Sequence, residues 1–137
     1  MTPDGLRKAA YERFYANWSG TSVVHYEGHP FTEPGPDVEW ARISVRNTGG
    51  GQTSIGPVGN RKYERDFSVF VQVFVPVTGG MKSGSELAQQ ARAIFEGVRL
   101  DPEAYLNNGL ITEQPIREGD KSRQINVEVL GKYLETK

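Results

Sequence analysis

The segment FSVFVQVFV, residues 67–75, constrains the fold more than any other part of the chain. Successive side chains of a β-strand point to opposite faces, so this segment carries two rows of residues. One row holds Phe67 and four valines, and the other holds Phe70, Gln72 and Phe74. Because both rows are mainly apolar, we expect a strand inside a sheet that is covered on both faces.

Three other segments have strand patterns. Residues 38–46, VEWARISVR, alternate apolar residues such as Ile43 with polar ones such as Arg42, and residues 123–130, RQINVEVL, alternate in the same way. Residues 21–28, TSVVHYEG, form a shorter candidate. Such alternation is typical of half-buried, antiparallel strands.

Two helices are predicted around these strands. Thr2, Pro3 and Asp4 have the order of an N-cap, a first-turn proline and a first-turn acid, and we expect a helix to about residue 17. Ser83 and Glu86 have the spacing of a capping box, which predicts the start of a second helix. Its apolar residues recur at helical spacing: Leu87, Ala91, Ile94, Phe95 and Val98.

A third, short helix is expected to begin at Asp101 and Pro102 and to stop at residues 107–109, NNG. The resulting order predicts an α+β fold. It consists of an antiparallel β-sheet packed by an N-terminal helix and a central amphipathic helix, with a long glycine-rich loop or hairpin. The 137 residues suit one domain, residues 1–137. No signal peptide or membrane span is expected, because no apolar run approaches the required length.

The glycine-rich segment RNTGGGQTSIG, residues 46–56, looks superficially like a phosphate-binding loop. A P-loop, however, closes on Lys followed by Ser or Thr, and a dinucleotide fingerprint leads into a helix, whereas this segment leads into a strand. A flexible loop or hairpin tip is therefore the preferred interpretation. The acids are dispersed and no catalytic triad emerges, so we expect no enzyme and no cofactor.

His25, Glu27 and His29 could suggest a metal site, since imidazole and carboxylate bind zinc. The alternative is a surface or partly buried histidine pair. The strand-then-turn pattern of these residues places the two rings poorly for one ion, and no third ligand is evident nearby. We therefore expect no metal.

The basic residues Arg61, Lys62 and Arg65, together with Arg42 and Arg46 on the preceding strand, surround the glycine-rich segment. A solvated face is one explanation, and contact with a partner is the other. The chain has a formal net charge of −1, so any contact with DNA would be loose. The row of Phe70 and Phe74 also needs cover, which could come from the N-terminal helix or from another subunit.

Residues 54–97, SIGPVGNRKYERDFSVFVQVFVPVTGGMKSGSELAQQARAIFEG, resemble the tail-terminator proteins of long-tailed bacteriophages. The matching features are the basic turn GNRKYER, the strand FSVFVQVFVP, the glycine turn TGG and the helix that ends in IFEG. The resemblance extends to FYANW, PDVEWARISV and INVEVL, so it covers most of the chain. Phe67 departs from the pattern, because a glycine is often found at that point.

This resemblance implies a structural virion protein that is made in the host cytoplasm. Such proteins form a ring, commonly a hexamer, at the head-proximal end of the tail tube. The ring stops tube polymerisation and joins the tail to the head-side connector at the neck, while genomic DNA passes loosely through the lumen. A head-completion or stopper protein of the neck is the alternative, and a small enzyme is a weaker one.

The expected contacts follow from the resemblance and the residues together. Residues 47–60 should form a projecting loop that meets an adjacent subunit or ring, and Arg42 and Arg46 should face the lumen or a partner. The residues expected at inter-subunit or inter-ring contacts are Gly49, Gly50, Gly51, Gln52, Arg61, Lys62, Arg65, Phe70 and Phe74.

Overall fold

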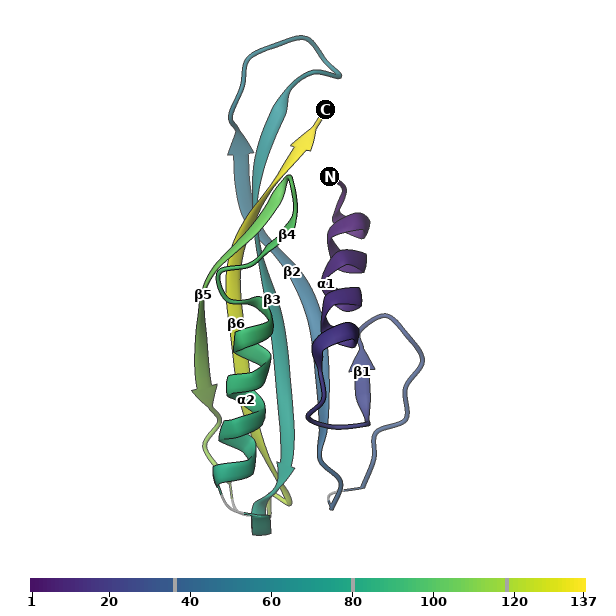
Figure 1. Ribbon diagram of the computed structural model, residues 1–137, viewed down its shortest axis with the longest axis vertical. Coiled ribbons are helices and arrows are strands. Elements are labelled where there is room, and N and C mark those ends of the chain that lie inside the picture. The colour runs from purple at the N-terminus through teal and green to yellow at the C-terminus, as the bar shows by residue number, and fades with distance from the viewer. Residues whose placement is uncertain (36, 80, 118) are drawn as a thin grey trace.

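The computed structural model describes residues 1–35, 37–79, 81–117 and 119–137 (Figure 1). It combines two α-helices with one six-stranded sheet. The elements in chain order are α1 (Pro3–Asn17), β1 (Val24–Tyr26), β2 (Trp40–Gln52), β3 (Lys62–Pro76), a short 3-10 helix (Val77–Gly79), α2 (Met81–Phe95), β4 (Arg99–Asp101), β5 (Ala104–Glu113) and β6 (Ser122–Thr136).

The sheet has the strand order β1-β2-β3-β6-β5-β4, so the segment that opened the sequence analysis lies between two long neighbours. Strands β2 and β3 form one long hairpin, and β6 pairs with the whole of β3, from Lys62 opposite Thr136 to Pro76 opposite Ser122. All pairs are antiparallel except the first, because β1 runs parallel to β2. The expectation of an antiparallel sheet is thus wrong for β1.

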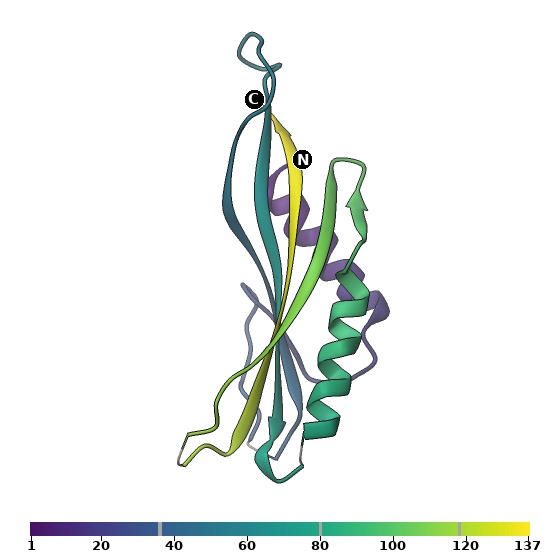
Figure 2. The ribbon, with the colours of Figure 1, turned by 90° about the vertical axis from the view of Figure 1, so that its left-hand side faces the viewer.

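Both helices pack on the same face of the sheet, which is clear from the side (Figure 2). The rings of Phe14 in α1 and Phe95 in α2 stack at 6.1 Å, and both side chains are fully buried. Beneath them lie the core-facing residues of the central strands, among them Ile43, Val71 and Val127. The N-terminal helix therefore does not cover Phe70 and Phe74, which lie on the opposite face.

The predicted start of α1 is confirmed, and the predicted start of α2 is wrong. Thr2 caps α1 by accepting a hydrogen bond from the Gly5 amide at 3.1 Å, as expected. Helix α2 begins at Met81, so the predicted capping box is wrong, and the hydroxyl of Ser83 instead donates to the Glu39 carboxylate at 2.8 Å. The helical stripe is confirmed from Leu87 to Phe95, whose members are buried, whereas Val98 lies beyond the end of α2 and is half-buried.

The short helix predicted after Asp101 is wrong, because these residues form β4, a tight turn and β5. The Asp101 carboxylate accepts a hydrogen bond from the Glu103 amide at 3.0 Å, which stabilises the turn. The following residues pair with β6, from Ala104 opposite Tyr133 to Glu113 opposite Ile125. Pairing with β6 thus stabilises a strand in residues whose local pattern favours a helix.

The glycine triplet lies in a strand and not in a loop. Gly49, Gly50 and Gly51 belong to β2 and pair with β3, after a register shift that follows Asn47. Gly50 has a φ of +138°, and a Cβ there would collide with the Glu64 carbonyl. The glycines therefore permit a β-bulge and a close approach of two backbones. The connection between β2 and β3 shrinks to residues 53–61, which we call the hairpin tip.

Candidate functional site

The sheet face opposite the helices is the first candidate surface, and we call it the open face. Strand alternation and register place its residues on β2, β3 and β6: Trp40, Arg42, Ser44, Arg46, Ser68, Phe70, Gln72, Phe74, Gln124, Asn126 and Glu128. Neither α1 nor α2 covers it (Figure 2). Phe70 and Phe74 are half-buried, whereas Trp40, Ser44, Ser68 and Asn126 are buried. The part of this face that a partner can reach is therefore centred on the two phenylalanines and the arginines beside them.

Aromatic rings form a continuous stack across one end of the open face. His25 stacks on Phe31 at 4.5 Å between ring centroids, Phe31 meets Trp40 at 5.3 Å, and Trp40 stacks on Phe74 at 4.1 Å. The parallel pairing of β1 with β2 places His25 opposite Arg42. The sequence analysis did not find Phe31, because nothing in the proline-rich segment around it indicates that the chain returns to Trp40.

Two arginines lie over these rings. The Arg42 guanidinium is 5.3 Å from the Trp40 ring and 5.7 Å from the Phe74 ring, and it donates to His25 Nδ1 at 3.2 Å. The Arg46 guanidinium is 4.3 Å from the Phe70 ring. Stacked guanidinium groups gain cation–π attraction and shield the ring from water. Arg42 and Arg46 are thus ordered parts of the open face, as well as sources of positive charge.

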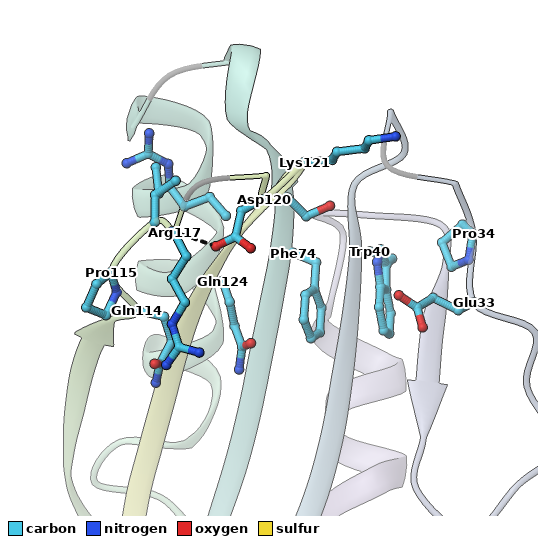
Figure 3. Close-up of a pocket in the computed structure, with 13 residues that line it drawn as sticks. Glu33, Pro34, Trp40, Phe74, Gln114, Pro115, Arg117, Asp120, Lys121 and Gln124 are labelled. Atoms are coloured by element: carbon cyan, nitrogen blue, oxygen red, sulfur yellow. Dashed lines mark hydrogen bonds between the residues drawn. The ribbon is translucent and has the colours of Figure 1, made fainter.

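An open cleft of about 640 Å³ lies where the open face meets the turn before β6 (Figure 3). Trp40 and Phe74 supply its apolar wall, and Glu33, Arg117 and Lys121 supply charges of both signs. The Asp120 carboxylate accepts a hydrogen bond from the Arg117 amide at 2.7 Å, which stabilises the turn. A cleft with an aromatic wall and a mixed-charge rim suits a protein segment.

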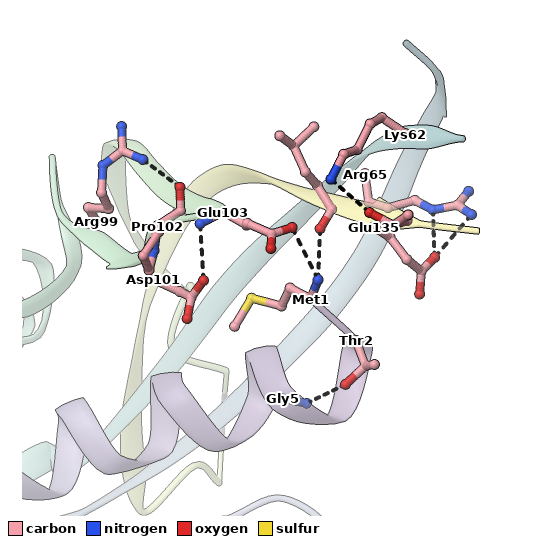
Figure 4. A network of polar contacts seen from close by, with 12 residues as sticks. Met1, Thr2, Gly5, Lys62, Arg65, Arg99, Asp101, Pro102, Glu103 and Glu135 are labelled. Atoms are coloured by element: carbon pink, nitrogen blue, oxygen red, sulfur yellow. Dashed lines mark hydrogen bonds and ion pairs between the residues drawn. The ribbon is translucent and has the colours of Figure 1, made fainter. Parts of the chain in front are cut away.

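The basic cluster at the base of the hairpin is largely engaged inside the subunit (Figure 4). Arg65 forms an ion pair with Glu135 at 3.2 Å, and Lys62 Nζ donates to Thr136 Oγ1 at 2.8 Å. Arg61 Nε donates to the Gly56 carbonyl at 2.7 Å. The charge of Arg65 is therefore balanced by Glu135, whereas Lys62 and Arg61 donate to uncharged oxygens and keep their positive charge.

The hairpin tip carries apolar side chains that no core contact explains. Ile55 is 101% exposed and Val58 is 83% exposed, at the far end of the molecule from the cleft (Figure 1). The sequence analysis did not single out either residue. The hairpin tip is thus a second candidate contact surface, in addition to the open face.

His25 and His29 have different partners in the structure. His25 Nδ1 accepts the hydrogen bond from Arg42, whereas the His29 ring lies beside Tyr11 with 6.4 Å between ring centroids. Among the described residues, no group of three His, Asp or Glu residues could hold an ion. Nor is any helix within the described ranges long and apolar enough to cross a membrane.

Shifted pKa values mark packing and ion pairing. Burial raises the pKa of Tyr11, Tyr26 and Tyr133 above the usual value. The hydroxyl of Tyr133 donates to Asn47 Oδ1 at 2.8 Å. The pKa of Lys132 is raised chiefly by its hydrogen bond to Glu64 and also by Asp66. The contact of Tyr133 links β6 to β2, and the contacts of Lys132 link β6 to β3.

No protein-family model matches the chain, and no curated protein sequence matches it. Solved structures do share its fold. One, whose name states no function, has a TM-score of 0.64 at 18% identity and covers 97% of this chain and 96% of its own. Another is a chain from the virion of a native gene transfer agent particle, with a TM-score of 0.54, 13% identity, and coverage of 95% of each chain.

Proposed function

We propose that this chain is a structural protein of a phage-like particle, and specifically the tail terminator that closes the head-proximal end of the tail tube. Two independent lines support the proposal. One is the similarity of residues 54–97 and their flanks to tail-terminator proteins, and the other is the shared fold with a chain of a gene transfer agent virion. The fold by itself does not specify a function, so the role also has to be supported by the surfaces that the subunit exposes.

The observation that carries the proposal is that both helices pack on one face of the sheet and leave the other face without a helix (Figure 2). A subunit of a closed ring presents different surfaces to its neighbours, to the adjoining rings and to the lumen. Here both helices lie on one face, which leaves the open face with Phe70 and Phe74, and the hairpin tip projects beyond β6 with Ile55 exposed. Ile55 and Val58 are both exposed on this tip, which gives an adjoining ring two apolar side chains to contact.

In this proposal the hairpin tip meets the tail-tube protein or the head-side connector. The neighbouring residues Gly49, Gly50, Gly51 and Gln52 contribute through the backbone of β2. Arg42 and Arg46 face the lumen or a neighbouring subunit, and Phe70 and Phe74 lie at the same surface. DNA contact is loose, because the chain has a formal net charge of −1 and Arg65 is paired with Glu135 within the subunit.

Electron microscopy of particles made without this protein tests the function. Overgrown tails of irregular length are expected for a tail terminator. Full heads that leak DNA, with tails of normal length, would instead assign the chain to the stopper of the neck. Normal infectious particles would refute both structural roles.

The contribution of the tip is tested separately. Replacing Ile55 and Val58 by serine should leave the thermal unfolding of the subunit unchanged, because neither side chain touches the core, yet should reduce the joining of tails to heads. Tyr15→Ser, on the exposed side of α1, is the matched control. Equal yields of joined particles from the tip variant and the control would refute a contact at the tip.

A further inference from the structure

A small pocket of about 280 Å³ lies between α1 and β1. Tyr11, Glu12 and Tyr15 of α1 line one side of it, and Tyr26 of β1 and His29 of the following turn line the other. Figure 1 shows β1 beside the second half of α1. Residues 11 and 15 are about one helical turn apart, so their rings lie on the same side of the helix. The pocket is separate from the open face and from the hairpin tip.

The aromatic rings of the pocket are inclined to one another and form walls. The Tyr11 and Tyr26 rings are 5.4 Å apart at an angle of 62°, and the Tyr11 and His29 rings are 6.4 Å apart at 56°. The Tyr11 hydroxyl donates to the Glu27 carbonyl at 2.9 Å, and the Tyr26 ring packs edge-on against the buried Phe14 ring at 6.3 Å. These contacts hold two of the walls in place without a ligand.

Tyr15 forms the outermost wall. It is 79% exposed, although a tyrosine ring offers a large apolar area for packing. The same ring lines a neighbouring pocket of about 270 Å³, together with Trp18 and Tyr26. Space on both sides lets the ring adjust to a ligand, and a ligand in the first pocket would cover apolar surface that water now contacts.

The charges around the pocket favour a cation. Glu12 lines it, and Glu27 is close enough to raise the pKa of Tyr11, after the larger effect of burial. Arg7, which is ion-paired within α1, has the smallest effect on that pKa and lowers it. Lys8 contacts Glu12 only at 3.9 Å through exposed side chains, a kind of pair that has little strength. The faces of the aromatic rings add negative potential.

Few hydrogen-bond acceptors line the pocket, which limits the kind of cation that it suits. Its lining is mainly aromatic, and the Tyr11 hydroxyl is engaged with the main chain. Lysine and arginine cations carry several N–H donors, and a donor that leaves water without gaining an acceptor costs free energy. A quaternary ammonium group has no N–H donor, and aromatic cages are the usual sites that recognise it.

We propose that this pocket binds a quaternary ammonium group through cation–π contacts with Tyr11, Tyr15 and Tyr26, with Glu12 at its rim. A small compound such as choline and a lipid with a phosphocholine headgroup carry the same group. The proposal is independent of the tail function, because none of these residues belongs to the open face or to the hairpin tip.

An NMR titration of the isotope-labelled chain with choline, at constant ionic strength, tests the proposal. Saturable shifts are expected at amides near residues 11–15 and 26–29. The control ligand is 3,3-dimethyl-1-butanol, the neutral isostere of choline, which should bind several-fold more weakly. No saturation by choline, equal binding of the two compounds, or shifts confined to other residues would overturn the proposal.

Variants of the outer wall test the cation–π contact itself. Tyr15→Leu should weaken choline binding by about 2–5-fold, and Tyr15→Phe, which keeps the ring, should bind nearly as the native chain does. Tyr105→Leu, at an exposed tyrosine of β5 outside the pocket, is the matched control and should leave binding unchanged. Both positions are exposed, so the variants should fold. Equal affinities of Tyr15→Leu and this control would overturn the proposal.

Cosedimentation with phosphatidylcholine vesicles identifies the source of the group. Choline binding without cosedimentation supports the proposal and assigns a free small compound as the ligand. Cosedimentation that choline competes away, and that Tyr15→Leu weakens, supports it and assigns a lipid headgroup.

Discussion

The packing of Phe67 against Gly131 gives the sharpest test of the fold. Gly131 in β6 lies opposite Phe67 in β3, and Phe67 is fully buried with its ring 5.7 Å from that of Tyr133. A Cβ at residue 131 would lie 2.5 Å from the Tyr105 carbonyl oxygen and 2.8 Å from two atoms of the Phe67 ring. Either β5 or the ring must move to admit a methyl group.

We expect Gly131→Ala to lower the free energy of unfolding by about 1–3 kcal/mol, the usual cost of overpacking a core. For a domain of this size, that loss corresponds to a decrease in Tm of roughly 3–15 °C. Chemical denaturation with matched m-values gives the free energy, and calorimetry gives Tm. Gly51→Ala in β2 is the control, because a Cβ there meets nothing within 4 Å. Its effect should stay within about 0.5 kcal/mol.

A double-mutant cycle identifies the cause. Phe67→Leu in the Gly131→Ala background should relieve the ring contact but not the contact with the Tyr105 carbonyl. The two substitutions should therefore couple favourably by at least about 0.5 kcal/mol. A cost for Gly131→Ala no larger than for Gly51→Ala, or strictly additive costs, would refute this account of the packing.

Three further predictions concern the core, the hairpin and the alkaline limit of stability. Phe95→Ala should lower the free energy of unfolding by about 3–5 kcal/mol, because the ring is fully buried against Phe14; an unchanged denaturation midpoint would contradict this. Gly50→Val should weaken the outer half of the hairpin, since valine resists a φ of +138°, and faster amide exchange at residues 62–66 should report it. Burial raises the pKa of Tyr133, so its stabilising effect is complete below the unfolded value near 10 and is lost as pH rises through the folded pKa. Tyr133→Phe should therefore show a smaller fall in Tm above pH 10, and identical falls in both proteins would argue against it.

The sequence predicted the elements whose signals are both local and strong. The cap at Thr2, the apolar stripe through Ile94 and the double row of β3 each depend on neighbouring residues only, and each is present. The outer part of the hairpin was missed because residues 62–66 have no apolar row. Cross-strand ion pairs such as Lys132 with Glu64 accompany the pairing there, and only the folded sheet reveals them.

The misses at the candidate site have physical causes too. Glycine favours loops and β-bulges alike, so the triplet at residues 49–51 could not distinguish a loop from a strand. Strand alternation identified Phe70 and Phe74 on the second face, but it did not identify the side chains that lie against them. The Arg46 guanidinium lies over Phe70, and the Phe31 ring packs against Trp40. Both contacts depend on how the strands are paired in three dimensions.

The central position of β3 has a consequence for how quickly the chain folds. Its partner β2 arrives through the short hairpin tip, whereas β6 arrives only after α2, β4 and β5. The contact between Pro76 and Ser122 is the closest along the chain in that second pairing. Loops of this length close slowly compared with hairpins, so we expect refolding on the millisecond-to-second scale. We expect the meeting of these two distant strands to limit the rate, and helix formation, which is faster, to precede it.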